Sequence, residues 1–220
     1  MSDSNTPADA RERLIQAGIE IFAEYGFSAT TTRMLADKAQ VNLSAIPYYF
    51  RSKEGLYNAT VGHIADILAA HLTPFLDRLA TETARGFAPE TARMLLQEGL
   101  STMVTVMCGD PGTMRFSQII LREQMAPTAA FDLIYPKVME RMLSAFSTLI
   151  ATITGETDPR QCSLQAILLM GQVMVFRAGR ATVVRRIGME GYTAREIAEI
   201  QELVVSRAMA ALDFMAIRQA

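Results

Sequence analysis

Residues 28–57 hold two short apolar patterns with a break between them, and this stretch constrains the fold more than any other. Apolar side chains follow helical spacing over Thr31–Ala39, and Asn42 then offers a side-chain acceptor that favours the start of a second helix. The second pattern ends in aromatic residues at positions 48–50. Two short helices joined by a turn of about three or four residues form a helix-turn-helix, whose second helix enters the major groove of DNA.

Polar side chains flank both expected helices at positions where a DNA backbone would lie. Hydroxyl groups stand at the start of the first helix, beside backbone N–H groups that can hold a phosphate. Residues 28–53 carry four basic side chains and one acidic one. The expected base contacts are Arg33, Leu43, Ser44 and Ala45. The other side chains expected to contact DNA are Thr31, Thr32, Asn42, Pro47, Tyr48, Tyr49 and Lys53.

The stretch TTTRMLADKAQVNLSAIPYYFRSKEGLY, together with the helix expected over Arg11–Tyr25, resembles the DNA-binding domain of the TetR family of transcriptional regulators. Members of this family usually carry tyrosine where this chain has Pro47. Proline inside a helix removes an N–H donor and costs about 3 kcal/mol, so we expect a second helix of about one or two turns, or a kink at Ile46. The resemblance implies a regulator that binds double-stranded operator DNA.

The rest of the chain also has helical patterns, bounded by capping residues and helix breakers. A long helix is expected over Lys53–Thr73, ending before Pro74. Later helices are expected to begin at Asp158 and Thr193, each of which offers a side-chain acceptor to free backbone N–H groups. No window alternates apolar and polar residues between hairpin turns. The sequence therefore predicts an all-α fold of about nine or ten helices.

The patterns divide the expected fold into two parts. Residues 1–62 are expected to form an N-terminal three-helix helix-turn-helix domain, and residues 63–220 a larger C-terminal helical domain for ligand binding and dimerisation. By resemblance to the TetR family, the long helices expected near 160–178 and 194–216 form the interface of a homodimer. Two copies would then present their second helices to a palindromic operator at successive major grooves.

The C-terminal part contains many of the chain's 14 methionines, whose flexible side chains suit an adaptable apolar pocket or ordinary core packing. Arg122, Glu123 and Arg177 lie within apolar helical stretches, where a buried charge needs a partner. These charges either pair with one another or hold a polar group of an effector. The side chains expected to line an effector pocket are Met103, Met107, Phe116, Ile119, Arg122, Glu123, Met142, Met170, Met174 and Arg177.

Two further stretches, FSQIILREQMAPTAAF and MVFRAGR, resemble a CecR-like subgroup of the TetR family. That resemblance implies a homodimer that responds to a small-molecule effector and controls efflux or stress genes. Repression, with release from the operator by a small apolar or amphipathic effector, is expected from the habit of the family. The alternative is a helical small-molecule-binding or interaction protein with weak or lost DNA binding, since residues 1–62 carry six basic and seven acidic side chains.

Residues 160–188 carry five arginines and no acidic residue. A second nucleic-acid surface is one interpretation of this charge. The other, which we prefer, is charge at helix ends balanced by acidic side chains of the last helix, such as Glu196, Glu199 and Glu202.

The residue sets of several other function classes are missing. The sequence has no nucleophile–base set, no helical His–Glu metal pair and no Gly-rich phosphate loop, so neither an enzyme nor a cofactor is expected. His63 and His71 lie about 12 Å apart along one helix, too far for a shared metal. The longest apolar run, near residues 166–176, is shorter than the roughly 20 residues of a membrane span, and no export signal is recognisable. A cytoplasmic protein without a membrane partner is therefore expected, with Cys108 and Cys162 as reduced core residues.

Overall fold

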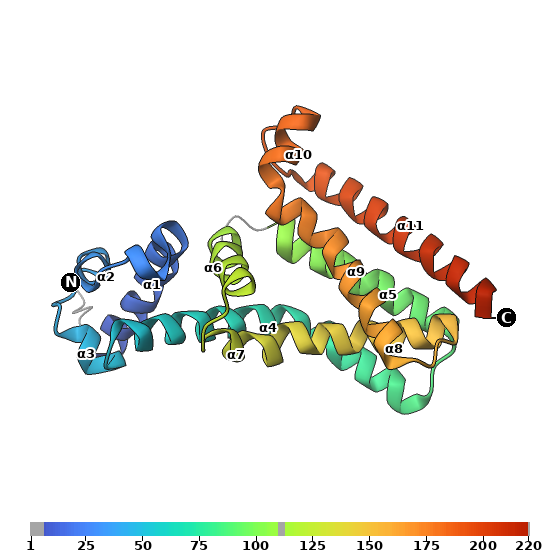
Figure 1. Ribbon diagram of the computed structural model, residues 1–220, viewed down its shortest axis with the longest axis horizontal. Helices are drawn as coiled ribbons and strands as arrows, with labels where there is room; N and C mark the ends of the chain where they lie inside the picture. Colours follow the sequence, from blue (N-terminus) through green and yellow to red (C-terminus); the bar gives the residue numbers. More distant parts are fainter. Residues whose placement is uncertain (1–6, 110–112, 220) are drawn as a thin grey trace, which may run out of the picture. The chain divides into compact units, whose positions relative to one another are not determined.

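The structure is a computed structural model that describes residues 7–109 and 113–219. Within these ranges it contains eleven α-helices, two π-helical segments and no strand, which confirms the expected all-α fold (Figure 1). The contacts divide the chain into two compact units. Unit 1 takes the chain up to Leu68 together with Met114–Lys137, and unit 2 takes Ala69–Thr113 and the chain from Val138 onward.

Unit 1 combines helices that are not consecutive in the chain. Its helices are α1 (Pro7–Ala29), α2 (Thr32–Ala39), α3 (Ala45–Phe50), α6 (Thr113–Met125) and α7 (Phe131–Ile134), followed by the π-helical segment η2 (Tyr135–Met139). Helix α4 (Lys53–Arg85) begins in unit 1 and continues into unit 2. The helices of unit 2 are α5 (Pro89–Val104), η1 (Thr105–Gly109, π-helical), α8 (Glu140–Thr154), α9 (Pro159–Ala178), α10 (Arg180–Ile187) and α11 (Ala194–Gln219). This division differs from the expected boundary at residue 62, because α6 and α7 join the helices of unit 1.

Helix α1 packs its apolar stripe against the helix-turn-helix. Leu14, Ala17 and Phe22 are buried, as the spacing predicts. At Gly26 a φ of +74° breaks the helical geometry, which confirms the expected helix end there, although a short segment continues to Ala29. The same spacing also places Tyr25 in this stripe, but Tyr25 is 47% exposed because it lies beside the break, where the stripe ends.

Helices α2 and α3 are short for reasons that the sequence carries. Thr31 caps α2, since its hydroxyl accepts the backbone N–H of Met34 at 3.2 Å. Helix α3 has six residues, within the expected one or two turns. Pro47 is its third residue, and N–H groups of a first helical turn have no helical acceptor. The proline therefore removes no hydrogen bond that α3 would otherwise make.

Helix α4 continues through Pro74, so the expected end before this residue is wrong. Proline within a helix costs about 3 kcal/mol. On either side of it, Leu72, Phe75 and Leu79 are buried in the core of unit 2. Burying one such side chain contributes about 1.5–3 kcal/mol. Core packing therefore outweighs the local cost of the proline.

Helices α5, α8, α9 and α11 lie side by side and enclose the core of unit 2 (Figure 1). Gly99 of α5 permits this close approach, because a Cβ there would lie 2.8 Å from ring atoms of both Phe75 and Phe146. Cys108 and Cys162 are buried in the same core as free thiols, as expected for small core residues.

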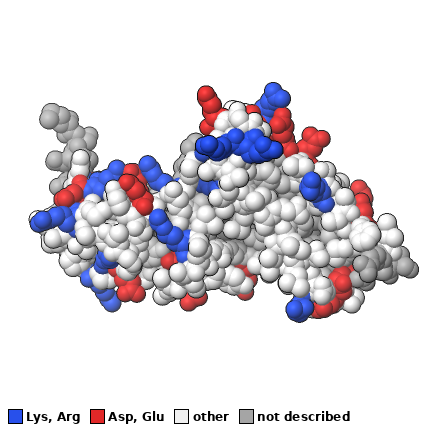
Figure 2. Space-filling model, turned by 45° about the horizontal axis from the view of Figure 1, so that its top comes forward, with Lys and Arg blue, Asp and Glu red and all other residues white. Residues whose placement is uncertain are grey.

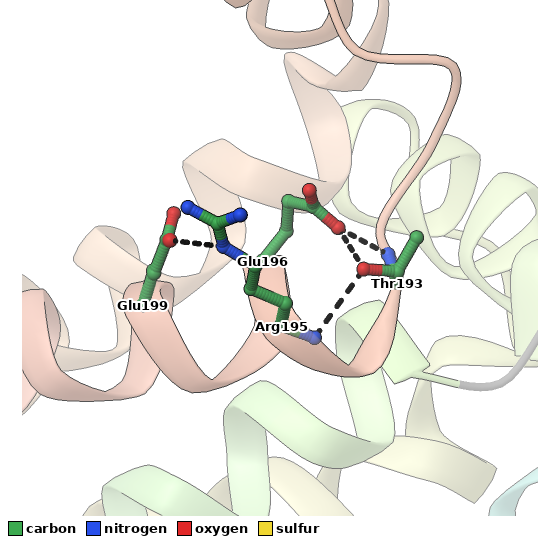
Figure 3. Close-up of polar contacts among 4 residues, drawn as sticks. All are labelled: Thr193, Arg195, Glu196 and Glu199. Carbon is green, nitrogen blue, oxygen red and sulfur yellow. Dashed lines mark hydrogen bonds and ion pairs between the residues drawn. The ribbon is translucent and has the colours of Figure 1, made fainter.

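Two helix starts in unit 2 follow the capping chemistry that the sequence predicts. Asp158 accepts the N–H of Arg160 at 2.9 Å at the start of α9. At the start of α11, the Glu196 carboxylate accepts the N–H of Thr193 at 2.9 Å, and the Thr193 hydroxyl accepts the N–H of Arg195 at 3.3 Å (Figure 3). The expected capping box is therefore confirmed.

Helix α10 buries none of its residues and carries three arginines. Two of the acidic side chains expected to balance them are engaged elsewhere, since Glu196 bonds Thr193 and Glu199 pairs with Arg195 (Figure 3). The direct partners of these two carboxylates are therefore a helix cap and an i,i+4 neighbour on α11. Figure 2 shows both basic and acidic side chains at the end of unit 2 that holds α10.

Helices α9 and α10 meet at a bend of 68° around Gly179. A Cβ at this position would lie 2.8 Å from the carbonyl oxygen of Val175, so the bend needs glycine. Within the described ranges no single helix has the length and apolar character to cross a membrane, whereas this bent pair meets the length and composition criteria together.

Candidate nucleic-acid interface

The turn between α2 and α3 is ordered by its own side chains. Gln40 ends α2 in the left-handed region, at φ 53° and ψ 48°. Asn42 Oδ1 then accepts both the N–H and the hydroxyl of Ser44, each at 3.0 Å. Ser44, and not Asn42 as expected, is the residue directly before α3, and its own side chain makes no capping hydrogen bond. Asn42 therefore orders the turn that leads into α3 and does not cap the helix, because its side-chain oxygen bonds Ser44, two residues further along the chain.

Helix α3 has an inner and an outer face. Ile46 and Phe50 are buried, and they hold the helix on unit 1. Tyr48 on the other face is 77% exposed, and Leu43 in the preceding turn is 46% exposed, which leaves large apolar surface away from the core. The rings of Tyr48 and Tyr49 meet edge to face, with centroids 4.7 Å apart. An exposed helix face anchored by two buried side chains is the arrangement that reads base edges in a helix-turn-helix.

The other side chains expected to contact DNA lie around this face with differing exposure. The exposed members are Thr31, Arg33, Asn42, Ser44 and Pro47, and the half-buried ones are Thr32, Ala45, Tyr49 and Lys53. The Thr31 hydroxyl is engaged as the cap of α2, while the neighbouring Thr30 is buried and donates to the Gly26 carbonyl at 2.6 Å. Of the threonines at this helix start, Thr30 is therefore structural.

Lys53 has partners inside the protein. Its Nζ donates to the carbonyl oxygens of Phe27 at 2.9 Å and Thr30 at 2.8 Å, and lies 4.4 Å from the centroid of the Phe27 ring. Two of the three N–H donors of the ammonium are thus used between the start of α4 and the segment that joins α1 to α2.

The ten side chains expected to line an effector pocket are divided between the two units. Unit 1 holds Phe116, Ile119, Arg122 and Glu123, and unit 2 holds Met103, Met107, Met142, Met170, Met174 and Arg177. In unit 2, Met103 and Met142 are buried in the core, and Met107, Met170 and Met174 are half-buried. The methionines expected in a pocket therefore include core residues as well as residues nearer the surface.

Arg122 and Glu123 each have partners other than one another. Arg122 Nη1 donates to the carbonyl oxygens of Phe22 at 2.5 Å and Ala23 at 2.8 Å, near the end of α1. The helix break at Gly26 leaves carbonyls of that last turn without helical N–H partners. Arg122 thus acts as a C-terminal cap for α1, from a position on α6.

Glu123 is 2% exposed and bonds three donors. Its carboxylate accepts the Tyr57 hydroxyl at 2.6 Å, the N–H of Thr128 at 2.9 Å and the Thr128 hydroxyl. Burial raises the pKa of Tyr57, and the hydrogen bond to Glu123 raises it further. This buried network ties α6 to α4 within unit 1.

Arg177 lies on α9 in unit 2. Its Nη2 is 3.5 Å from the Thr113 hydroxyl oxygen. Burial raises the pKa of the Cys108 thiol, and the Arg177 charge opposes that rise. The guanidinium, the thiol and the core therefore share one end of unit 2, beside the π-helical segment η1.

An open groove of about 700 Å³ lies between α4 and α8 in unit 2. Leu76, Leu79, Ala80, Ser144 and Thr148 are among the residues that line it. None of the ten side chains expected to line a pocket is part of this lining, among the residues described. In the same residues no three His, Cys, Asp or Glu side chains gather in a way that could hold a metal.

Sequence reasoning missed Tyr57 and Thr128, which complete the polar network around Glu123. Tyr57 ends the helix-turn-helix motif, and its position alone gave no sign that its hydroxyl would meet a carboxylate 66 residues away. Thr128 follows Pro127, and nothing in its sequence position indicates a carboxylate partner. Such contacts depend on tertiary packing, and no short-range spacing encodes them.

Comparison with known proteins agrees with this geometry. Residues 14–60 match the family model "Bacterial regulatory proteins, tetR family", and residues 92–215 match the C-terminal domain of the HTH-type transcriptional dual regulator CecR. The HTH-type transcriptional dual regulator CecR of Shigella flexneri is 35% identical over 201 residues, which cover 89% of this chain and 87% of that protein.

Solved structures share the fold at low identity. A TetR-like transcriptional regulator from Rhodococcus sp. RHA1 aligns with a TM-score of 0.63 at 19% identity, covering 92% of this chain and 97% of its own. FadR from Bacillus subtilis, solved with stearoyl-CoA, aligns with a TM-score of 0.57 at 16% identity, covering 90% of this chain and 96% of its own. The chain therefore belongs to the TetR family of helix-turn-helix transcriptional regulators, with a C-terminal domain of the CecR type.

Proposed function

We propose that this regulator is a homodimeric repressor that leaves a palindromic operator when a small apolar or amphipathic effector binds its C-terminal part. The observation that carries the DNA-binding half is α3, which buries Ile46 and Phe50 and exposes Tyr48, with Leu43 exposed in the turn before it. The expected DNA contacts remain the side chains of α2, the turn and α3. In this proposal, residues 1–62 form the DNA-binding domain (the reading head), and residues 63–220 are responsible for dimerisation and effector binding.

The dimer is supported by exposed apolar side chains on α9 and α11. The exposed residues are Leu164, Ile167, Leu168, Val175, Leu203, Phe214 and Ile217. Large apolar surface gathered on neighbouring helices is typical of a protein interface. A two-fold dimer would pair α9 and α11 of one copy with those of the other, giving two reading heads.

The half-buried methionines of unit 2 and Arg177 support the proposed effector binding. Arg177 places a positive charge among otherwise apolar side chains. FadR, which shares the fold, was solved with stearoyl-CoA, an amphipathic ligand with an anionic head. To act as a switch, an effector needs to bind one of two dimer conformations, which differ in the distance between the two DNA-binding parts, more favourably by ~1–3 kcal/mol. In unit 1, Arg122 and Glu123 connect α6 to α1 and α4, so a shift of α6 would reach the reading head.

The proposal includes a cytoplasmic, non-enzymatic protein with no membrane partner. The decisive experiment sequences the genomic fragments that the purified protein retains and measures their affinity by fluorescence anisotropy. We expect an inverted repeat among the retained fragments and weaker binding when the spacing of its half-sites changes by half a helical turn. Retention of no fragment above background would instead favour a helical small-molecule-binding protein that has lost DNA binding.

A separate experiment addresses the interface. Ile167→Glu places a charge on the exposed α9 face and should give monomers in sedimentation, whereas Met94→Glu, an equally exposed apolar position on α5, should leave the dimer intact. Equal sedimentation of wild type and Ile167→Glu would argue against this face.

A further inference from the structure

The Lys and Arg side chains of unit 1 differ in whether they have an interaction partner within the protein. Most have partners: Arg13 with Asp9, Lys38 and Arg115 with Glu20, Lys137 with Asp66, Arg122 with α1 carbonyls, Lys53 with two carbonyls, and Arg11 with the Phe50 ring. Among the Lys and Arg residues described in this unit, only Arg33 and Arg51 have side chains with no hydrogen bond, ion pair or ring contact. Both are exposed, one in the first turn of α2 and the other directly after α3.

Arg51 also has an unusual backbone. Its φ is 68° and its ψ is −39°, and its N–H bonds the Pro47 carbonyl at 3.1 Å. Left-handed φ at a helix end favours glycine, because a Cβ crowds the following carbonyl. Gln40 is the other non-glycine residue with positive φ in the described ranges, and its ψ of 48° lies in the left-handed well. Arg51 lies outside that well.

The junction of α3 and α4 explains why the backbone must turn here. Two residues, Arg51 and Ser52, connect the helices. Ser52 Oγ accepts the N–H of Gly55 at 3.0 Å, and a Cβ on Gly55 would collide with the Phe50 carbonyl oxygen. The two helix ends are thus in close contact, and a glycine at position 51 would make the turn without strain.

Lys53 ties the start of α4 to the segment that joins α1 to α2. It is half-buried, and its ammonium holds the carbonyls of Phe27 and Thr30, at the segment that leads into α2. An ammonium with two short bonds to protein carbonyls positions the helices that it joins. It has only one donor left for a phosphate.

From these contacts we infer that Arg51 supplies a cation that binds the DNA phosphate backbone, and that Lys53 is a positioning residue that braces α1 against α4. The inference rests on the proposed DNA-binding role of α2 and α3. An exposed guanidinium with all five N–H donors open suits a phosphate, which accepts two parallel hydrogen bonds. Strained backbone retained at such a position is characteristic of functional sites.

The test measures the full-length protein on a retained genomic duplex and on a mixed-sequence duplex of equal length, over a series of KCl concentrations. Each phosphate contact contributes about 0.9 to the slope of log affinity against log salt. Arg51→Gly should flatten that slope by about 0.9 per bound head and weaken both duplexes about fivefold per head near 0.15 M salt. The ratio between the two duplexes should not change, and Arg51→Lys should restore the slope.

Two matched variants separate charge from folding. Arg51→Gly and Gln40→Gly both replace a non-glycine residue at positive φ, so each should keep or raise the melting temperature by roughly 2 °C. Only the first should change the salt slope. Lys53→Gln removes a charge but should lower the melting temperature and keep the slope, when binding is measured well below melting.

A wild-type slope in Arg51→Gly, or a flattened slope in Lys53→Gln alone, would overturn the inference while leaving DNA binding in place. Wild-type protein that binds neither duplex at any salt concentration would overturn the proposed function and the inference together.

Discussion

The contact between Arg122 and the end of α1 leads to a quantitative prediction for Arg122→Ala. The guanidinium donates to the carbonyls of Phe22 and Ala23 at 2.5 and 2.8 Å. A hydrogen bond to a charged group contributes about 1.5–3 kcal/mol, and two of them would give up to about 6 kcal/mol. Arg122 is exposed, however, so water replaces part of what the substitution removes. We therefore expect a loss of about 2 kcal/mol.

For a chain of this length, 1 kcal/mol corresponds to roughly 2–4 °C in melting temperature, so Arg122→Ala should melt about 4–8 °C lower. Circular dichroism during heating measures this shift. Hydrogen exchange should also become faster at the amides that follow the break at Gly26, since α6 no longer caps that turn.

Arg115→Ala is the matched control, because it lies on the same helix and forms only an exposed ion pair with Glu20 at 3.6 Å. Its effect should stay within about 0.5 kcal/mol. If Arg122→Ala melts at the wild-type temperature but no longer releases DNA in response to an effector, the capping role is refuted. The guanidinium would then belong to the effector site, which is the other role that its sequence context allowed.

Three further perturbations test the packing. Tyr57→Phe removes a hydrogen-bond donor from the buried Glu123 carboxylate and should lower the free energy of unfolding, measured with urea at neutral pH, by about 1–3 kcal/mol. Because the pKa of Tyr57 is raised in the folded protein, wild-type stability should fall as the pH rises above about 10. The variant should lack this part of the fall. Gly99→Ala should destabilise the protein by about 1–3 kcal/mol, because the added Cβ would clash with Phe75 and Phe146. Gly62→Ala, which has open space around it, should stabilise the protein by up to about 1 kcal/mol. Equal effects of the two substitutions would contradict the close packing at Gly99. Thr193→Ala should lower the melting temperature by roughly 2–4 °C through loss of the α11 cap. Ser163→Ala, whose hydroxyl bonds only the Pro159 carbonyl within α9, should change it little.

Local chemistry in the sequence was sufficient for much of the fold. Thr31, Asp158 and Thr193 start helices because a side-chain oxygen next to free N–H groups needs no distant partner. The glycine at 26 ends the main part of α1 for an equally local reason, its access to positive φ. The short α3 also follows from sequence, although its proline lies in the first turn, where it removes no hydrogen bond.

Tertiary packing decided what local chemistry could not. Pro74 looks like a helix end in isolation, yet α4 continues through it because Phe75 and its neighbours are buried in the core of unit 2. The sequence marked Arg122 and Glu123 as charges in need of partners and Lys53 as a DNA contact, but it could not name the carbonyls and the phenol, up to 100 residues away, that they bond. A helix cap is encoded within four residues, whereas the partner of a buried charge depends on which helices the whole fold brings together.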